Sequence, residues 1–235
     1  MKYLILFDID GTLINLKKGV AAPIFFKAIK DVLGFEIDSN IYIDFAGRTD
    51  YGILSYIFKS HNFPTEIEHQ KMEEIYEKIF EDFNQLLTSD SIKVLDGVPR
   101  LLELLSQNQD LKLGLVTGNF KKNALLKLKM CGLDKYFSFG AFGDFLPNRL
   151  DLPKIALQNA NSLNGNIFKN KNTLVVGDTH RDIQSAKHNK MKSLAVSTGG
   201  SNYSDLIKFE PDAIFENFED SLNVYNTILS LFKNN

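Results

Sequence analysis

The sequence has few of the residues from which disulfide-stapled, fibrous or low-complexity proteins are built. Among its 235 residues it has a single cysteine, Cys131, which excludes an intramolecular disulfide and a multi-thiolate metal site and favours a reducing compartment. Only 6 prolines and 15 glycines are present, while 44% of the residues are hydrophobic and 24% are charged. This composition is typical of a globular chain and excludes collagen-like and disordered classes.

Long apolar runs and an excess of charge of one sign are also missing. No segment approaches the roughly 20 apolar residues of a membrane-spanning helix. The apolar start, residues 1–7, is too short for a signal peptide and ends at Asp8 and Asp10, so it is expected to be a buried strand in a cytoplasmic protein. With 27 basic and 29 acidic residues the net charge is -2, which argues against nucleic acid as a partner.

Short apolar runs alternate with amphipathic segments along most of the chain. Strands are predicted at residues 111–116, 137–142, 173–176 and 193–196, and helices at residues 99–107, 121–131, 153–163 and 181–190. Alternating strands and helices predict an α/β fold with a doubly wound parallel sheet covered on both faces.

The interval 16–89 has a different pattern. It shows helical periodicity at 51–58 and 67–87 and no convincing strand, and Thr49 is expected to cap the helix that follows it. We therefore predict a helical insert at 16–89 in a core domain made of residues 1–15 and 90–235. Such an insert would lie above the carboxyl end of the first strand, where doubly wound sheets bind ligands. Its aromatic residues are expected mostly in its core, namely Phe25, Phe26, Tyr42, Phe45 and Tyr56.

The most informative pattern follows the first strand. Asp8 and Asp10 are two residues apart, so their side chains leave an extended chain on the same side, and Gly11 allows a sharp turn directly afterwards. Like charges set side by side are costly, so such a pair usually holds a cation, shares a proton or does both.

Two further acidic residues follow the strand at 173–176. In a parallel sheet Asp178 would arrive beside Asp8 and Asp10, and Asp182 would lie one helical turn further on. Oxygen ligands without histidine or cysteine suit a hard cation such as Mg²⁺.

A polar tripeptide, Thr117-Gly118-Asn119, ends the strand at 111–116. A hydroxyl and backbone N–H groups at a strand-to-helix junction can cradle an anion, and the same residues can cap the next helix.

These three motifs, in this order and each after a strand, resemble those of the haloacid dehalogenase superfamily. The resemblance covers nearly the whole chain, and the insert lies where phosphoglycolate phosphatase-like members of that superfamily carry a helical cap. It implies a Mg²⁺-dependent phosphatase that acts on a small phosphorylated metabolite. For the oligomeric state, both a monomer and a homodimer are left open.

The resemblance also implies a role for each acidic residue. Asp8 would be the nucleophile that forms an aspartyl-phosphate, and Asp10 would be the general acid and base. Mg²⁺ would be held by the side chains of Asp8 and Asp178 and by the backbone carbonyl of Asp10, with Asp182 adjacent to the metal.

Binding of the phosphoryl oxygens is implied for Thr117, Gly118 and Asn119. The superfamily also places a basic side chain before the next helix, and here Arg149 and Lys154 compete for that role; the loop position favours Arg149. Arg48 in the insert is a candidate substrate contact or a solvated surface residue.

Alternatives remain open within and outside this class. A phosphomutase of the same fold shares both aspartates and a helical cap. A dehalogenase would need neither Asp10 nor Asp178, and a catalytically silent binding module would have lost one of the acids.

Overall fold

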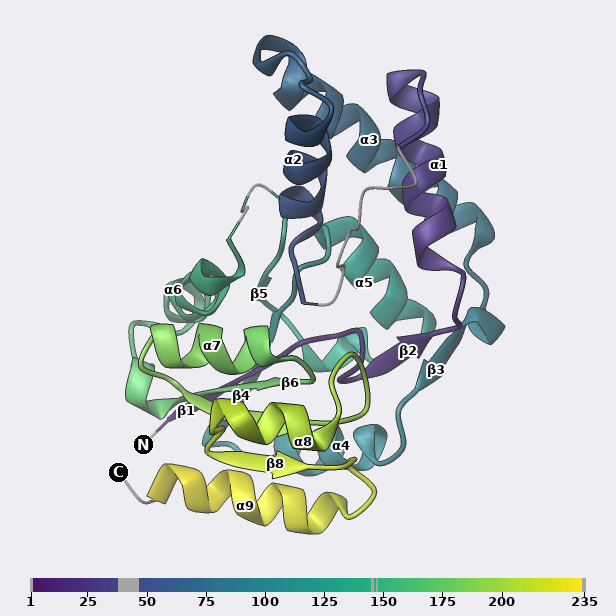
Figure 1. Ribbon diagram of the computed structural model, residues 1–235. Coiled ribbons are helices and arrows are strands. Elements are labelled where there is room, and N and C mark those ends of the chain that lie inside the picture. Colours follow the sequence, from purple (N-terminus) through teal and green to yellow (C-terminus); the bar gives the residue numbers. More distant parts are fainter. Residues whose placement is uncertain (1, 38–46, 145, 147, 234–235) are drawn as a thin grey trace.

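A parallel sheet organises the chain. The computed structural model describes residues 2–37, 47–144, 146 and 148–233, and within them a six-stranded sheet has the order β5-β4-β1-β6-β7-β8 with every neighbouring pair parallel. The strands are β1 (Tyr3–Phe7), β4 (Leu111–Val116), β5 (Gly140–Ala141), β6 (Thr173–Gly177), β7 (Lys192–Val196) and β8 (Ala213–Phe215) (Figure 1). The predicted α/β class is confirmed.

β1 lies in the middle of the sheet because it is apolar on both faces. Ile5 and Phe7 enter one hydrophobic cluster, and Leu4 and Leu6 enter another. All four side chains are fully buried. The chain therefore leaves the centre of the sheet at Asp8, between the ends of β4 and β6.

Helices cover both faces of the sheet. The face of Ile5 and Phe7 packs against α4 (Val98–Gln107), α5 (Lys121–Met130) and α9 (Ser221–Lys233), and the opposite face packs against α6 (Leu152–Asn164) and α7 (His180–His188). Figure 1 shows α7 and α9 on opposite sides of the sheet. This is the doubly wound arrangement that the alternating pattern predicts.

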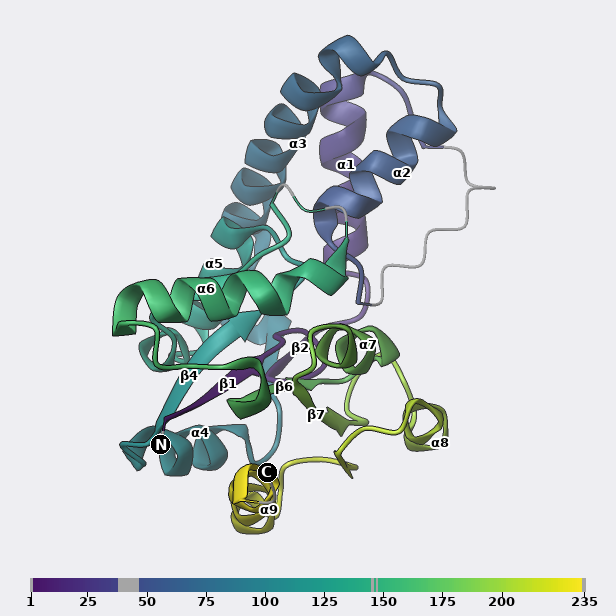
Figure 2. The ribbon, with the colours of Figure 1, turned by 90° about the vertical axis from the view of Figure 1, so that its left-hand side faces the viewer.

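Three helices form a second packed group beyond the carboxyl ends of the strands. They are α1 (Ala21–Leu33), α2 (Asp50–Ser60) and α3 (Thr65–Leu86), and Figure 2 shows them side by side above the sheet. Their shared cluster also takes in Phe120, the residue before α5, so this group packs directly on the rest of the molecule. The division of the chain into two domains stays a prediction.

Several elements were not predicted. β2 (Ile14–Leu16) and β3 (Ile92–Val94) form an antiparallel pair where the chain enters and leaves the helical group, and three residues are too few for a periodic signal. The sequence analysis also missed α1, β8, α9 and the short α8 (Tyr203–Leu206). Single 3₁₀ turns occur at Ser89–Ser91, Asp134–Tyr136, Arg149–Asp151, Asn170–Asn172 and Ile207–Phe209.

Two predicted features differ in detail. β5 is shorter than the predicted strand 137–142, because backbone pairing begins only at Phe139, whose carbonyl accepts a hydrogen bond from the Leu115 N–H at 3.1 Å. Tyr56 is 40% exposed rather than in the core of the helical group, whereas Phe25 is buried. Tyr42 and Phe45 lie outside the described residues.

In the part of the chain that the structure describes, no helix has the length and apolar character needed to cross a membrane.

Candidate active site

The turn after β1 brings the first acidic motif close to the second. The Asp8 N–H donates to the Val176 carbonyl at 2.9 Å, and Gly11 adopts a φ of +83° that permits the chain to turn back. A Cβ at Gly11 would overlap the Asp178 carboxyl group. Glycine is therefore required at this position both by its backbone conformation and by the close approach of Asp178.

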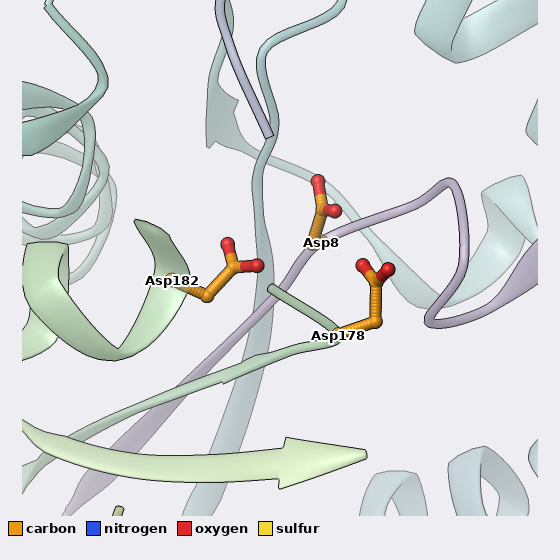
Figure 3. Close-up of side chains that lie close together, drawn as sticks. All are labelled: Asp8, Asp178 and Asp182. Atoms are coloured by element: carbon orange, nitrogen blue, oxygen red, sulfur yellow. The ribbon is translucent and has the colours of Figure 1, made fainter. Parts of the chain in front are cut away.

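Three carboxyl groups converge at the carboxyl end of the sheet. Oxygen atoms of Asp8, Asp178 and Asp182 all lie within 4.8 Å of one another, and the three side chains are buried (Figure 3). They come from the end of β1, from the loop after β6 and from the first turn of α7. The structure thus brings together Asp8 and Asp178, as the sequence predicts, and places Asp182 beside both.

Asp178 and Asp182 are each fixed by hydrogen bonds. The Gly200 N–H donates to Asp178 at 2.6 Å. One oxygen of Asp182 caps α7 by accepting from the Thr179 N–H at 3.0 Å and from the Thr179 hydroxyl at 2.7 Å. The second oxygen of Asp182 is left to face Arg149.

Arg149 is the cation of this cluster. Its Nη2 lies 3.1 Å from Asp8 Oδ1 and 2.5 Å from Asp182 Oδ1, and its side chain is buried. Its Nε is buried without a hydrogen-bond partner in the described structure. Lys154, the competing cation, lies exposed on the surface of α6. The structure brings Arg149, and not Lys154, to Asp8.

The electrostatics of the cluster favour an added cation. Burial raises the pKa of Asp8 to about 6, with Arg149 opposing the shift and the charges of Asp182 and Asp10 adding to it. Burial and the charges of Asp8 and Asp182 raise the pKa of Asp178 well above its usual value. Burial lowers the pKa of Arg149, but Asp182 and Asp8 outweigh it and raise that pKa overall. Three carboxylates face one guanidinium, so full ionisation leaves two negative charges uncompensated.

Asp10 has a different environment from Asp8. Its side chain is 39% exposed and is held by Lys127, whose Nζ lies 3.0 Å and 2.8 Å from the two carboxylate oxygens. The Asn119 amide donates to Asp10 at 2.7 Å and to the Thr117 hydroxyl at 2.8 Å. Asp10 is therefore paired by neighbouring side chains, while Asp8 is buried among like charges.

The first residue of α2 and the segment before it contact the loop after β4 directly. The Asp50 N–H donates to the Gly118 carbonyl at 2.8 Å, and the Phe120 N–H donates to the Asp50 carboxylate at 2.8 Å. A Cβ at Gly118 would overlap the Arg48 carbonyl, so the two loops can approach closely only with glycine there. Thr49 caps α2 as predicted, accepting from the Gly52 N–H at 3.0 Å.

A pocket of about 780 Å³ opens between these loops and the helical group. Asp8, Asp10 and Asp178 line it on one side, together with Thr117, Gly118, Asn119, Lys127 and Arg149. Apolar residues of the helical group line the other side, among them Phe25, Ile53 and Phe83. Arg48 also lines the pocket, with its guanidinium 5.7 Å from the centre of the Tyr56 ring.

The sequence analysis missed four ionisable residues of this pocket, Lys17, Lys18, Asp50 and Lys127, of which Asp50 and Lys127 contact the loop after β4. Burial raises the pKa of Asp50 to about 7, although the Phe120 N–H and Lys127 oppose the shift. Lys127 is one of four lysines in α5. The available signal was its position three residues after Ala124 and four residues after Asn123, both buried, which places it on the inner side of the helix.

The fold and the site together define a Rossmann-like α/β protein with an acidic centre at the carboxyl ends of its strands. The family model described as "Haloacid dehalogenase-like hydrolase" matches residues 5–196. The chain belongs to this family, which confirms the resemblance based on the three motifs and the expectation of a hydrolase.

Relatives of known name support the same assignment. The chain is 27% identical over 225 residues to pyrophosphatase PpaX of Bacillus mycoides, covering 95% of this chain and 97% of that protein. It is 26% identical to pyrophosphatase PpaX of Listeria innocua, with 94% of each chain covered.

Solved structures share the fold. A β-phosphoglucomutase from Clostridium difficile matches with a TM-score of 0.71 at 22% identity, covering 100% of this chain and 98% of that one. A predicted phosphoglycolate phosphatase from Haemophilus somnus matches with a TM-score of 0.64 at 24% identity, covering 95% and 97%. These likenesses establish the architecture.

Proposed function

We propose that this protein is a Mg²⁺-dependent phosphatase that hydrolyses a small phosphomonoester through an aspartyl-phosphate on Asp8. The observation that carries the proposal is the buried carboxylate cluster of Asp8, Asp178 and Asp182 around a single arginine, at the base of the pocket that Asp10 also lines.

The residues present fit a divalent cation. The raised pKa values of Asp8 and Asp178 reflect carboxylates that lack sufficient positive charge nearby. Their oxygens, with the Asp10 backbone carbonyl, form the kind of donor set that Mg²⁺ prefers. When bound, such an ion neutralises charge that separates a carboxylate from an anionic phosphoryl group. Asp182 already accepts from Thr179 and Arg149, so we assign it to positioning Arg149 beside the metal site.

The two acids of the first motif divide the chemistry between them. An Asp8 oxygen forms the bond to phosphorus as the bond to the leaving oxygen breaks, and Asp10 gives its proton to that oxygen. Asp10 then takes a proton from water, whose oxygen attacks phosphorus and releases Asp8. Proton transfer requires a group open to the pocket, and the exposed carboxylate of Asp10 meets that requirement.

Cationic and polar groups are available for the transferring phosphoryl oxygens. We assign this role to Arg149 and to the loop Thr117-Gly118-Asn119, which line the pocket beside Asp8. The unpartnered Nε of Arg149 supports the assignment, because a buried N–H group without an acceptor is costly and a phosphoryl oxygen would supply one. The exposed position of Lys154 argues against this role for that residue.

The helical group would act as the cap that surrounds the leaving group and limits the access of water. This assignment treats residues 16–89 as a separate cap domain on the core of 1–15 and 90–235. Arg48, which lines the pocket without an ion-pair partner among the described residues, is proposed to contact the substrate.

The identity of the substrate is open within one chemical class. The named relatives are pyrophosphatases, and pyrophosphate, like a small phosphomonoester, presents a terminal phosphoryl group to the same residues. The absence of a nucleic-acid partner, the cytoplasmic location and the monomeric or homodimeric state stay predictions.

The test is phosphate release across a panel of small phosphomonoesters and pyrophosphate, each with Mg²⁺ and with excess chelator. Metal-dependent release from at least one of them is expected. Turnover that persists in chelator would contradict the proposal. Conversion of a sugar phosphate that occurs only with a bisphosphate activator would identify the alternative, a phosphomutase.

A further inference from the structure

A buried lysine supports the second acid of the first motif. Lys127 is 4% exposed, and its Nζ lies 3.0 Å and 2.8 Å from the two oxygens of Asp10 and 2.7 Å from Asn119 Oδ1. Lysine is rarely buried to this degree without a partner, because an ammonium group loses much hydration energy on leaving water. Lys127 instead has an acceptor for each of its three protons.

Lys127 is fixed by its surroundings, whereas Asp10 faces the pocket. The neighbours of Lys127 on α5, Ala124 and Leu128, are fully buried in the core. The ammonium group of Lys127 lies 5.6 Å from the centre of the Phe83 ring on α3. The side chain of Lys127 is 5% exposed and that of Asp10 is 39% exposed. The lysine is therefore the rigid member of the pair.

Asn119 closes the same network. It accepts from Lys127 through its oxygen and donates through its amide nitrogen to Asp10 and to Thr117. The orientation of the Asp10 carboxylate is thus determined by two groups of α5 and its preceding loop. Asp8 and Asp182 lie outside this network because they are paired with Arg149, and Lys127 acts on the pocket residue Asp50 through its charge.

We propose that Lys127 is a positioning residue that holds the Asp10 carboxyl group toward the leaving oxygen of the substrate. The proposal rests on the proposed function. The proton that moves belongs to Asp10, while Lys127 keeps its own protons and balances the negative charge that Asp10 acquires when its proton passes to the leaving oxygen. Lys127 then matters most for esters whose leaving group requires a proton as the phosphorus–oxygen bond breaks.

The experiment compares two esters that differ in this requirement. An alkyl phosphate releases an alkoxide and needs protonation, whereas p-nitrophenyl phosphate releases a stabilised phenolate and needs little. Values of kcat/KM are measured with Mg²⁺ for the wild type, Lys127→Met and the matched control Lys129→Met, because kcat/KM reports the step that expels the leaving group. Lys129 is exposed on the same helix.

For Lys127→Met we expect kcat/KM to fall on the order of 10²-fold with the alkyl ester and by less than about tenfold with the nitrophenyl ester. Lys129→Met is expected to match the wild type with both. Equal losses of Lys127→Met with the two esters, or no loss, would overturn the proposal. The alkyl ester is chosen as one that the wild type hydrolyses in the panel above, and inactivity of the wild type across that whole panel would instead contradict the proposed function.

A double-mutant cycle separates positioning from general damage. If Lys127 acts through Asp10, Lys127→Met causes no further loss in an Asp10→Asn background. Lys127→Arg, which retains the positive charge, is expected to recover part of the activity with the alkyl ester. Additive losses in the cycle would show that Lys127 acts independently of Asp10 and would reject the proposal, even if one variant proved less stable.

Discussion

Asp8 and Asp10 are the same residue type, two positions apart, yet their surroundings differ in almost every respect. Asp8 is buried with Asp178 and Asp182, and one arginine serves both Asp8 and Asp182. Asp10 is 39% exposed and is paired with its own lysine.

The difference shows how a shared turn can support two chemical roles. Burial and like charges raise the pKa of Asp8 to about 6, which supports the proposal that an added cation binds on this side of the site. Asp10 already has Lys127 and Asn119 and faces the pocket, which suits a group that exchanges a proton with substrate and water. The comparison predicts that substitutions in the buried cluster around Asp8 and substitutions at the Asp10–Lys127 pair have different effects on activity and stability.

The largest expected effect is on the buried side. Asp8→Asn is expected to lower phosphate release by more than about 10³-fold, because the amide cannot form the covalent intermediate. The fold is expected to persist, since the change removes a like charge from the cluster. Phosphate release and thermal unfolding of the same samples measure both effects, with the exposed Asp96→Asn as the control. Substantial activity in Asp8→Asn would remove the distinction between the two acids.

The next effect concerns the cation that serves the buried side. Arg149→Met is expected to lower the activity strongly and to reduce the free energy of unfolding by about 3–5 kcal/mol, because Asp8 and Asp182 lose their buried partner. Lys154→Met is expected to change stability by no more than about 0.5 kcal/mol, since Lys154 is exposed. Denaturant unfolding and phosphate release test the pair, and the reverse order of effects would assign the basic role to Lys154.

The smallest effect is the pH dependence of the metal-free protein. The pKa of Asp8 is raised to about 6 from an ordinary value of 3.8, so between these pH values the folded state binds its proton more tightly than the unfolded state. The wild type should therefore lose stability relative to Asp8→Asn as pH rises from about 4 to about 6, by at most about 3 kcal/mol.

Mg²⁺ should reverse this loss, because it binds the ionised carboxylates. The stabilisation of the wild type by Mg²⁺ is expected to grow as pH rises through about 6, measured as the shift in melting temperature. A difference between wild type and Asp8→Asn that stays constant with pH, or that widens in favour of the wild type, would contradict the raised pKa.

The sequence predicted the parts of this molecule that depend on periodicity and chain order. The buried run before Asp8 and the alternation of strands and helices were sufficient for the parallel sheet, and strand order then brought Asp178 to Asp8. The short strands β2 and β3 escaped prediction because their pairing is between residues far apart in the chain.

The ion pair between Asp10 and Lys127 could not be predicted from the sequence in the same way. Lys127 lies 117 residues from Asp10 and is one of several lysines in α5, and its burial depends on how α5 packs against β1 and α3. Arg149 was favoured from its position in a loop, but its contact with Asp182 as well as Asp8 depends on the first turn of α7. Tertiary packing, rather than local pattern, decides both.

The central claim, that Asp8 carries the phosphoryl group and Asp10 moves the proton, can be tested by trapping the intermediate. Asp10→Asn would be mixed with p-nitrophenyl phosphate and Mg²⁺, quenched in acid, and the peptide containing Asp8 examined by mass spectrometry. The nitrophenolate leaves without a proton, while water attack lacks its base, so a phosphoryl group on Asp8 is predicted to accumulate. A burst of nitrophenolate with Asp8 unmodified, or with the phosphoryl group on another residue, would contradict this account.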